Sequence, residues 1–565
     1  MKKPFSKIYP QKWAQIAILT GFCLILFFFN LNRWDLWNSD EPRYAQVARE
    51  MVNGGDWILM HYNGKIYGHK PPLFFWMIAF SSYLWQGFTP LAARFPSAFF
   101  GTLTVLLTFF LGRHLYSSRP GFLSGLILAT SFEFVFLSTR TNIDATLTFF
   151  TTASLLCFFH WYQYSPLHSF PLPQGEREGV RGNWVKSGNR RNLLIYGFYI
   201  GMALATLAKG PVGFILPLLV SLVYLIIQRD WKGIKRMKLL PGMILFIVIV
   251  LAWYLPALLK GGKDYFNETI LNHSINRFAE GTTHVRPFYY YLYNFPADFL
   301  PWFFFLPSAI VYGFSRGMVE KRKEFLFLLI WFAVIFLFFS LSKGKRGIYL
   351  LPLYPVVSLM VGKLWDDFIS ISTKHFRSEW ISFPLFGSMG FIFLAGGAIL
   401  WIVSAKFSSY FFYSLPVAFL LMGGSLAMFF LYRIKYYGAI LFLLIGMMAG
   451  GVFYTWRVVF PLVNPYKSAR FISQEVTSRI QPGERLGIYG GFVTGSYNFY
   501  TGIVPIEELE QRESLFNFLR SSERVFCFIK YRDFLQFQTW EGKPEVQLIV
   551  RRKVGGDDIV LISNR

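Results

Sequence analysis

The sequence is poor in charged residues and in cysteine. Only 15% of its 565 residues are Asp, Glu, Lys or Arg, whereas 54% are hydrophobic and 20% are aromatic, so one soluble core cannot bury the apolar surface. The three cysteines, Cys23, Cys157 and Cys527, show no paired spacing, which argues against a disulfide framework and a thiolate zinc site. The composition therefore indicates a membrane protein with many spans.

Acidic residues are scarcer than basic ones, and the formal net charge is +25. Lys and Arg fall mostly in short segments between apolar runs, where they set membrane topology and meet anionic headgroups. This distribution argues against a nucleic-acid partner. The Gly490-Gly491 pair lies in no phosphate-loop or dinucleotide pattern, and we expect no nucleotide or redox cofactor.

Apolar segments long enough to cross a bilayer recur along the first 460 residues. A further stretch, 71–85, is short and begins with two prolines, so we expect it to lie at the interface rather than to cross. The sequence predicts about thirteen spans, near 13–31, 91–112, 120–137, 145–162, 193–208, 211–228, 239–259, 297–314, 325–341, 348–362, 381–403, 411–431 and 438–457.

The positive-inside rule orients these spans. If 71–85 does not cross, the basic segments all fall on the side of the N-terminus. We therefore predict a cytoplasmic N-terminus and a C-terminus on the outer face. The basic segments are 112–119, 174–192, 229–238, 316–323, 374–377 and 432–435.

The composition changes after residue 460, which divides the chain into a membrane domain, 1–460, and a C-terminal domain, 461–565. Short strand-like runs alternate there with helix-like segments, which is typical of a small α/β domain. The expected strands are 485–491, 524–530, 545–550 and 558–563, and the expected helices are 466–480 and 514–522.

Residues 38–51, NSDEPRYAQVAREM, place adjacent carboxylates directly after the first span. Pro42 suits a first helical turn, and we expect an amphipathic helix lying on the membrane. Capping by Asp40 and dipole complementation by Glu41 would explain both acids structurally, whereas carboxylates at a bilayer boundary are costly and tend to be functional. The apolar positions of this helix are Tyr44, Val47, Ala48 and Met51.

Further polar residues are expected on the same outer face, contributed by several separate loops. Cations there could bind the phosphate of an anionic lipid by charge-assisted hydrogen bonds, although headgroup attraction and snorkelling remain alternatives. The two histidines could ligate a metal or merely hydrogen-bond in loops. These residues are Arg43, His69, Lys70, Asp144, Lys209, His273, Arg277, Lys345 and Arg346.

These motifs resemble, in sequence order, the aminoarabinose transferase branch of the protein-mannosyltransferase-like (GT-C) glycosyltransferases. The resemblance covers about residues 10 to 460. It is carried by DEPRYAQVARE, YGHKPP, NIDA, AKGP, NRF, HVRPFYY and SLSKGKRGIYLLPLYP.

The resemblance implies an all-α bundle of about thirteen transmembrane helices with juxtamembrane helices, and a small periplasmic α/β domain in a bacterial inner-membrane protein. It implies a sugar donor on undecaprenyl phosphate and a lipid A-like acceptor. Its acidic motifs correspond to Asp40-Glu41 and Asp144, and its lipid-phosphate cations to Arg43, Lys70 and Arg277. Lys209 matches the family's lysine between the fifth and sixth spans, and Lys345 and Arg346 are expected to form a phosphate-facing wall.

One motif departs from the family pattern. The family commonly has Glu-Lys-Pro-Pro where this chain has His69-Lys70-Pro71-Pro72, and that Glu is a proposed metal ligand. The family's ligand histidine falls at or beside Asn272 and His273. A divalent metal held by His69 and His273 and a metal-free site both remain open.

We therefore predict an inverting glycosyltransferase that uses a polyprenyl-phosphate sugar, with 4-amino-4-deoxy-L-arabinose as the candidate sugar. Asp40 would orient the acceptor or act as general base, while Glu41 and Asp144 would position the sugar or a cation. Alternatives are a protein O-mannosyltransferase-like or polysaccharide-modifying hexosyltransferase, and a lipid-linked saccharide flippase. A flippase favours ionisable residues near mid-membrane, whereas here they gather at one face.

Overall fold

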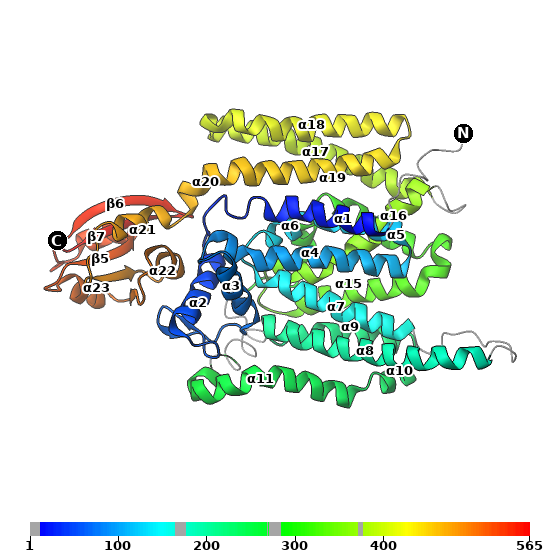
Figure 1. The fold of residues 1–565 in the computed structure, drawn as a ribbon. Helices are drawn as coiled ribbons and strands as arrows, with labels where there is room; N and C mark the ends of the chain where they lie inside the picture. Colours follow the sequence, from blue (N-terminus) through cyan, green and yellow to red (C-terminus); the bar gives the residue numbers. More distant parts are fainter. Residues whose placement is uncertain (1–11, 164–176, 268, 270–283, 371–376) are drawn as a thin grey trace.

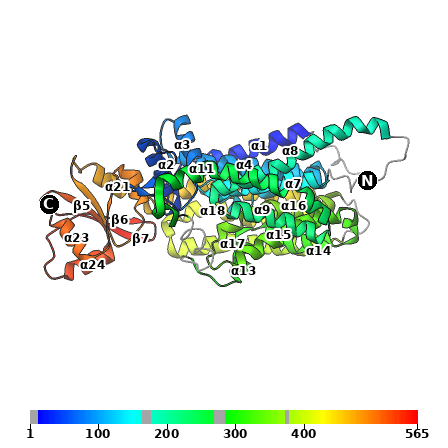
Figure 2. The same cartoon turned by 90° about the horizontal axis from the view of Figure 1, so that it is seen from below.

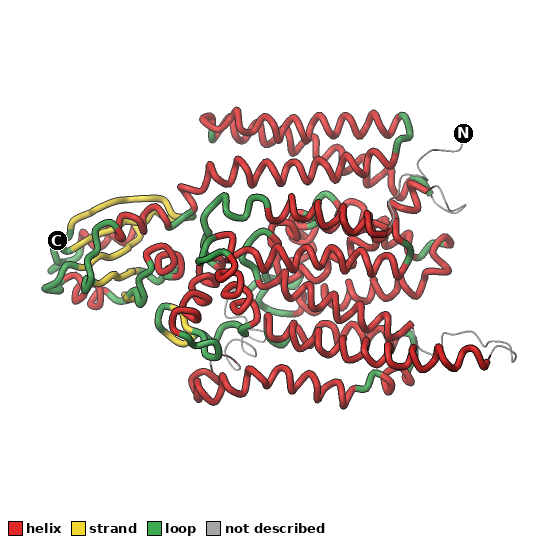
Figure 3. The backbone as a smooth tube through the Cα atoms, viewed as in Figure 1, coloured by secondary structure: helices red, strands yellow, loops and turns green. Residues whose placement is uncertain are grey.

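The computed structural model describes residues 12–163, 177–267, 269, 284–370 and 377–565. Long helices lie side by side in a bundle, and a small domain containing a sheet lies at one end of it (Figure 1). Among the residues that the structure describes, the strands lie at that end, as Figure 3 shows. The expected helical membrane part with a C-terminal α/β domain is confirmed, except that the membrane part also contains one short hairpin, His61–Tyr62 with Lys65–Ile66.

The first half of the membrane part contains α1 (Lys12–Cys23), which continues as η2 (Leu24–Phe28), then α2 (Asp40–Gly54), β1 (His61–Tyr62), β2 (Lys65–Ile66), α3 (Leu73–Leu84), α4 (Pro90–Leu115), α5 (Ser118–Ala129), α6 (Phe132–Ser138), α7 (Ile143–Gln163), α8 (Arg177–Lys209), α9 (Val212–Ile227), α10 (Trp231–Arg236) and α11 (Leu239–Phe266). The second half contains α13 (Tyr290–Asp298), η6 (Trp302–Phe305), α14 (Leu306–Gly313), η7 (Arg316–Lys321), α15 (Arg322–Leu341), η8 (Gly347–Leu353), α16 (Tyr354–Ser370), α17 (Glu379–Lys406), η9 (Ser408–Tyr410), α18 (Phe411–Arg433), α19 (Tyr437–Tyr454) and η10 (Thr455–Val459).

Each of the thirteen predicted spans coincides with an apolar helix or helix pair. Among the described residues, nine helices are long and apolar enough to cross a membrane, and two bent pairs bring the number to 11. The shorter apolar helices Lys12–Phe28 and Val212–Ile227 coincide with the two remaining predicted spans. The bent pairs are α5 with α6, at 69°, and α13 with the segment Trp302–Gly313, at 113°.

The helix α2 forms as predicted, with its apolar positions buried. Tyr44, Val47, Ala48 and Met51 are at most 5% exposed, and the Tyr44 ring packs edge-on against Phe74 and Phe75 of α3. The ambiguous segment 71–85 folds as α3, which has 12 residues and lies beside α2 at the end of the bundle (Figure 1). At that length it cannot span a bilayer.

Asp40 does not cap α2. Ser39 occupies the N-cap position without a side-chain capping bond, and Asp40 and Glu41 stand in the first turn. Their carboxylates bind arginine side chains instead. Arginine pairing replaces the capping explanation that the sequence left open for Asp40.

The C-terminal domain contains α20 (Phe460–Lys467), α21 (Arg470–Thr477), β3 (Arg485–Tyr489), α22 (Gly495–Thr501), β4 (Glu507–Leu509), α23 (Arg512–Leu519), β5 (Val525–Lys530), α24 (Tyr531–Thr539), β6 (Gln547–Val554) and β7 (Asp557–Ser563). The strand order is β4-β3-β5-β7-β6. β3 is parallel to β4 and β5, while β7 is antiparallel to β5 and β6. The predicted strands are present, whereas β4, α22 and α24 were not predicted.

The two ends of the bundle differ in what they carry. The C-terminal domain, α2 and α3 lie at one end, and the basic helix α10 lies at the other (Figure 1). Figure 2 shows the same separation, with α14 far from the C-terminal domain. The predicted acidic and basic residues of α2 lie at the first of these ends, so the candidate site is described there.

Candidate active site

Asp40 is the centre of a cluster of cations at the start of α2. Its carboxylate forms ion pairs with Arg43, one turn along the same helix, and with Arg346, where Arg346 Nη2 lies 3.1 Å from Asp40 Oδ2. Burial alone would raise the pKa of the Asp40 carboxyl, but Arg43, Arg346 and Lys70 together hold it below its ordinary value. Three predicted cations, Arg43, Lys70 and Arg346, are thus brought together around the ionised carboxylate of Asp40.

Glu41 points into a different environment, deep in the protein. Its carboxylate accepts from Arg94 Nε at 2.8 Å and lies 2.8 Å from Arg140 Nη2. The backbone N–H groups of Trp37 and Thr141 also donate to it, at 3.1 and 3.0 Å. Burial opposes ionisation, but the two guanidinium groups lower the pKa of Glu41 to about 2. All the acceptor capacity of this carboxylate is used within the protein.

Arg94 and Arg140 were not predicted. Arg94 is fully buried, and its guanidinium also donates to the carbonyl oxygens of Leu31, Trp34 and Asp35 at 2.7–2.9 Å. It therefore fixes the loop between the first span and α2. A lone arginine inside an apolar run, as in PLAARF, is the sequence signal that could have identified it.

Asp144 and Lys209 form a second buried pair. Asp144 stands in the first turn of α7 and Lys209 ends α8, and their side chains are 4% and 10% exposed. The Lys209 ammonium also lies over the ring of Tyr349, 4.4 Å from its centroid. Asp144 acts electrostatically on Arg346, so this pair lies next to the Asp40 cluster without joining it.

Lys345 and Arg346 lie on a connecting strap, residues 342–346, which leads from α15 into η8. The strap is held by a bridge between Val285 and Gly344 and by the Lys345 N–H, which donates to His284 O at 3.0 Å. Lys345 is only 3% exposed, and its ammonium donates to the carbonyls of Ser342 and Arg286. Arg346, by contrast, reaches Asp40.

The possible metal ligands are only partly described. His69 follows the β1–β2 hairpin, and its ring lies 4.8 Å from that of Tyr67. His273 and Arg277 lie outside the described residues. Within the described ranges, no three His, Cys, Asp or Glu side chains come together as a metal site would require. The described residues therefore do not by themselves make a metal centre.

Three cavities open around this cluster. The central cavity, of about 710 Å³, is lined by Asp40, Arg140, Arg346 and the Gly555-Gly556 turn of the C-terminal domain. The acidic cavity, of about 290 Å³, lies beyond Arg346 and contains Glu133 and Asp298. The interdomain cavity, of about 250 Å³, lies between the C-terminal domain and the α2 region, which comprises α2, the β1–β2 hairpin and the residues up to His69.

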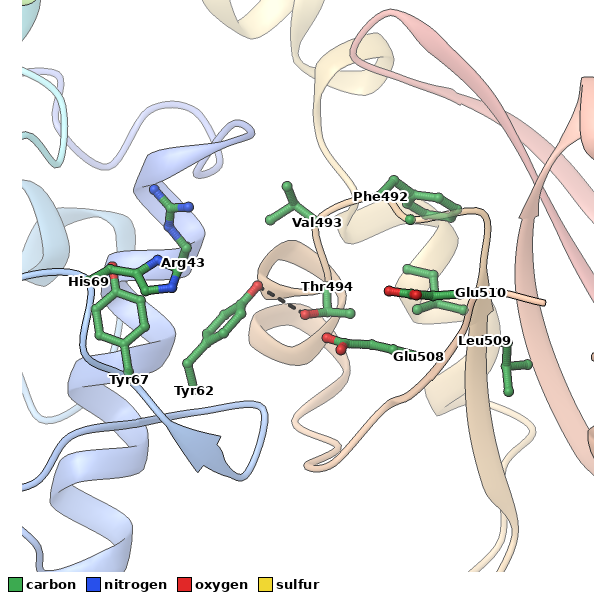
Figure 4. Close-up of a pocket in the computed structure, with 12 residues that line it drawn as sticks. Arg43, Tyr62, Tyr67, His69, Phe492, Val493, Thr494, Glu508, Leu509 and Glu510 are labelled. Atoms are coloured by element: carbon green, nitrogen blue, oxygen red, sulfur yellow. Dashed lines mark hydrogen bonds between the residues drawn. The ribbon is translucent and has the colours of Figure 1, made fainter. Parts of the chain in front are cut away.

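Figure 4 shows the interdomain cavity. Arg43, Tyr67 and His69 stand on one wall, and Glu508 and Glu510 stand on the other, which belongs to the C-terminal domain. The hydroxyl groups of Thr494 and Tyr62 are 2.9 Å apart and join the two walls.

The C-terminal domain also holds the segment that precedes Asp40. Tyr500 Oη accepts from the backbone N–H of Leu36 at 2.7 Å, and Asn464 Oδ1 accepts from Trp37 Nε1 at 2.8 Å. Ser496 donates to the side chain of Asn38. Asp40 is therefore positioned from both sides, by the membrane helices and by the C-terminal domain.

Comparison with known proteins shows which family this sequence matches. A model described as dolichyl-phosphate-mannose-protein mannosyltransferase matches residues 14–262. An undecaprenyl phosphate-α-4-amino-4-deoxy-L-arabinose arabinosyl transferase of Aeromonas salmonicida is 31% identical, over 69% of this chain and 66% of its own length. The chain belongs to the aminoarabinose transferase-like GT-C glycosyltransferases.

The GT-C fold extends over the whole chain. The crystal structure of ArnT from Cupriavidus metallidurans bound to undecaprenyl phosphate matches with a TM-score of 0.80 and 19% identity, covering 98% of this chain and 99% of that one. An uncharacterised Aquifex aeolicus protein is 29% identical over 86% of this chain and 87% of its own length. The named arabinosyl transferases are matched over 59–66% of their length.

Proposed function

We propose that this GT-C protein is an integral-membrane inverting glycosyltransferase that transfers a sugar from a polyprenyl (undecaprenyl) phosphate donor to lipid A or a related envelope glycolipid. The observation that carries the proposal is the Asp40 carboxylate, held between Arg43 and Arg346 in the central cavity at one end of the bundle. The names of the relatives, which refer to undecaprenyl phosphate and to an amino sugar, support the donor class.

In this reaction the cations stabilise the leaving group, and Asp40 acts on the acceptor. A lipid phosphate departs with negative charge, so Arg43, Lys70 and Arg346 would lower the barrier by binding its oxygens as the sugar bond breaks. The acceptor oxygen attacks the anomeric carbon from the opposite face, which inverts its configuration. Asp40 orients that acceptor at the reacting carbon through Arg43 and Arg346, the two cations that it holds in place.

The state of Asp40 supports an anionic acceptor. Its pKa is held below the ordinary value by the neighbouring cations, which makes the carboxylate a weak base. A phosphate acceptor is already ionised and needs little deprotonation, whereas a hydroxyl of a protein or polysaccharide needs a stronger base. This difference favours a lipid A phosphate over the acceptors of the alternative hexosyltransferases.

The other predicted residues have supporting roles in this proposal. We assign Glu41 to positioning the first loop through Arg94 and Arg140, and Asp144 with Lys209 to positioning η8 through Tyr349. Lys345 holds the strap that delivers Arg346. Arg277 and His273 remain predictions, and no step is assigned to a metal.

We also propose an orientation in the bacterial inner membrane. Basic residues of α10 and of the α4–α5 connection lie at the end of the bundle opposite the C-terminal domain. Positively charged loops stay in the cytoplasm. The N-terminus would then be cytoplasmic, and the site and the C-terminal domain would be periplasmic.

The proposal is tested by following the sugar. Mass spectrometry of lipid A and of periplasmic proteins, from cells with and without the gene, should show loss of a sugar-sized mass from the lipid A fraction. Asp40→Asn should lower transfer about 100-fold or more in a reconstituted assay. Asp56→Asn, at a partly exposed ion pair with Lys260, is the matched control and should stay near wild-type activity.

Three other results would contradict parts of the proposed function. A fully active Asp40→Asn enzyme would remove Asp40 from the chemistry. Loss of the mass from protein instead of lipid A would support the protein-glycosylating alternative, and flipping of a lipid-linked saccharide without transfer would support a flippase.

A further inference from the structure

Lys467 is a cation of the central cavity that the proposed reaction does not yet use. It is the last residue of α20, which continues the last membrane helix into the C-terminal domain. It lines the central cavity together with Asp40 and Arg346. Its side chain is exposed, and among the residues that the structure describes its ammonium group has no hydrogen-bond or ion-pair partner. Lys467 is therefore available to an anion in the cavity.

The charges around the central cavity favour an anionic ligand. Its two carboxylates, Asp40 and Glu41, are each paired with two arginines, so neither is left to neutralise Lys467. The arginines are Arg43 and Arg346 for Asp40, and Arg94 and Arg140 for Glu41. Because the cations outnumber the acids, the cavity attracts negative charge.

The position of α20 is fixed relative to the loop that leads to Asp40. Asn464 Oδ1 accepts from the backbone N–H of Asp35 at 3.1 Å and from Trp37 Nε1 at 2.8 Å, and its amide donates to Asp35 Oδ2 at 2.8 Å. Lys467 follows Asn464 by three residues, and residues at that spacing share one face of a helix. The face of α20 that binds this loop therefore also carries Lys467.

The turn between β6 and β7 lies beside Lys467 in the wall of the cavity. The backbone N–H of Gly555 donates to the carbonyl of Tyr466 at 2.9 Å, and both Gly555 and Gly556 line the cavity. Gly555 has a φ of 69°, which favours glycine, and nothing lies within 4 Å of a Cβ built on either residue. The C-terminal domain thus contributes one free ammonium group and an unobstructed turn.

The cations near Asp40 are divided between two cavities. Arg43 lines the interdomain cavity, whereas Lys467 lines the central one. Inversion places the leaving phosphate and the acceptor on opposite sides of the anomeric carbon, so two separate cationic positions suit it. The central cavity, of about 710 Å³, lies within the range of about 300 to 1,000 Å³ for ligand sites. Phe136 and Phe460 add apolar surface beside Lys467, as an amphiphilic acceptor requires.

We propose that Lys467 binds the phosphate of the acceptor glycolipid in the central cavity, and that α20 and the β6–β7 turn make the C-terminal domain the part of the chain that selects the acceptor. The inference rests on the proposed function and extends it, because it gives the acceptor a binding residue and the C-terminal domain a role in specificity. Arg43 and Lys70 then serve the donor phosphate, while the Lys467 ammonium, a compact point charge, serves that of the acceptor.

The test measures the KM for each substrate separately. The protein is reconstituted in vesicles with undecaprenyl phosphate-4-amino-4-deoxy-L-arabinose as donor and short-chain lipid A as acceptor. Lys467→Ala should raise the KM for lipid A about tenfold, because a charge-assisted hydrogen bond is lost, and should leave the KM for the donor unchanged. Lys467→Arg should retain most of the affinity. Lys406→Ala is the matched control, since Lys406 is also an exposed lysine at the end of a helix, α17, and should change neither KM.

Binding of lipid A to the detergent-solubilised protein, without donor, removes the chemistry from the comparison. Wild type should bind short-chain lipid A about tenfold more tightly than its fully dephosphorylated form, and Lys467→Ala should bind the two alike. The Tm of Lys467→Ala should equal that of wild type, because an exposed side chain is replaced.

Several results would overturn the inference. They are a wild-type KM for lipid A in Lys467→Ala, loss of affinity for undecaprenyl phosphate instead of lipid A, which would assign Lys467 to the donor, and inorganic phosphate that binds as tightly as lipid A, which would indicate a site for free phosphate. Phosphate-selective binding of lipid A that depends on Lys467, without transfer of any sugar, would overturn the proposed function and leave the assignment of Lys467 standing.

Discussion

Asp40 and Glu41 are neighbours in the chain, but their side chains enter different environments. Successive residues of a helix point about 100° apart, so Asp40 faces Arg43 and Arg346 in the central cavity while Glu41 faces Arg94 and Arg140. Glu41 is 3% exposed and Arg94 is fully buried. Under the proposed function, the carboxylate of Asp40 serves the chemistry and that of Glu41 serves the structure.

Removing the charge of Glu41 should destabilise the protein. Glu41→Gln leaves two arginines without a counter-charge, and breaking a buried pair in this way costs about 3 kcal/mol or more. Thermal unfolding in detergent should show a lowered Tm. Glu320→Gln is the control, because Glu320 is exposed and surface changes stay within about 0.5 kcal/mol. A Glu41→Gln protein that kept the wild-type Tm and lost activity would assign Glu41 to the chemistry instead.

At this scale the sequence identified acids and cations but not their partners. Asp40 and Arg43 are three residues apart, so their pairing follows from helix geometry alone. The pairing of Glu41 with residues 94 and 140, or of Asp40 with residue 346, depends on how distant helices pack. No local pattern contains that information.

Helix packing brings the site residues to one end of the bundle. The crossing of α4 and α5 is close because two glycines meet there, and a Cβ on Gly112 would lie 2.7 Å from the Cα of Gly121. α4 carries Arg94, and α5 leads directly into α6, which carries Glu133. The spacing of these helices therefore affects the positions of Arg94, which pairs with Glu41, and of Glu133.

Substitution of Gly121 tests that crossing. In Gly121→Ala the new Cβ would lie 2.6 Å from Phe109 O and 2.8 Å from Arg113 N, so the helices must separate, at a cost of about 1–3 kcal/mol. Tm should fall, and transfer activity should fall with it. Gly397→Ala on α17 is the matched control, since nothing lies within 4 Å of its Cβ and alanine favours a helix over glycine. Equal stability of the two variants would show that the crossing is not tight.

The elements themselves were largely predictable, for a physical reason. A bilayer requires about 20 apolar residues per helix, and this constraint identified all thirteen segments. The C-terminal domain carries no such constraint. β4 is a three-residue strand, Glu507–Leu509, whose two acids give no apolar alternation, and α22 has seven residues, too few for a periodic signal.

At the scale of the whole molecule, the C-terminal domain packs against α2 and the β1–β2 hairpin. Arg49 of α2 donates to Phe499 O at 2.7 Å and lies 4.2 Å from the centroid of the Phe499 ring. Gly495, at the start of α22, approaches the backbone of Arg43, because its Cβ would lie 3.0 Å from the Arg43 Cα. The domain thus rests on the helix that presents Asp40 and Arg43.

Asn63, in the turn between β1 and β2, forms several hydrogen bonds across this contact. It is 2% exposed, its amide donates to Ile506 O at 2.9 Å and to Glu508 at 3.2 Å, and its carbonyl accepts from Ile506 N at 2.7 Å. Its φ of 53° is a conformation that aspartate also tolerates. Asn63→Asp therefore changes the chemistry of the contact while keeping the turn.

Asn63→Asp should loosen the C-terminal domain, because a carboxylate would face the Ile506 carbonyl and the Glu508 carboxylate. An unsatisfied buried group costs about 1–3 kcal/mol, so hydrogen exchange in Gly495–Thr501 should accelerate about tenfold, and transfer should weaken as Asn38 and Arg43 lose their support. Asn53→Asp, an exposed change on α2, should alter neither. Unchanged exchange together with lost transfer would mean that Asn63 acts on the substrate, whereas faster exchange with full transfer would mean that the domain is not needed to position Asp40.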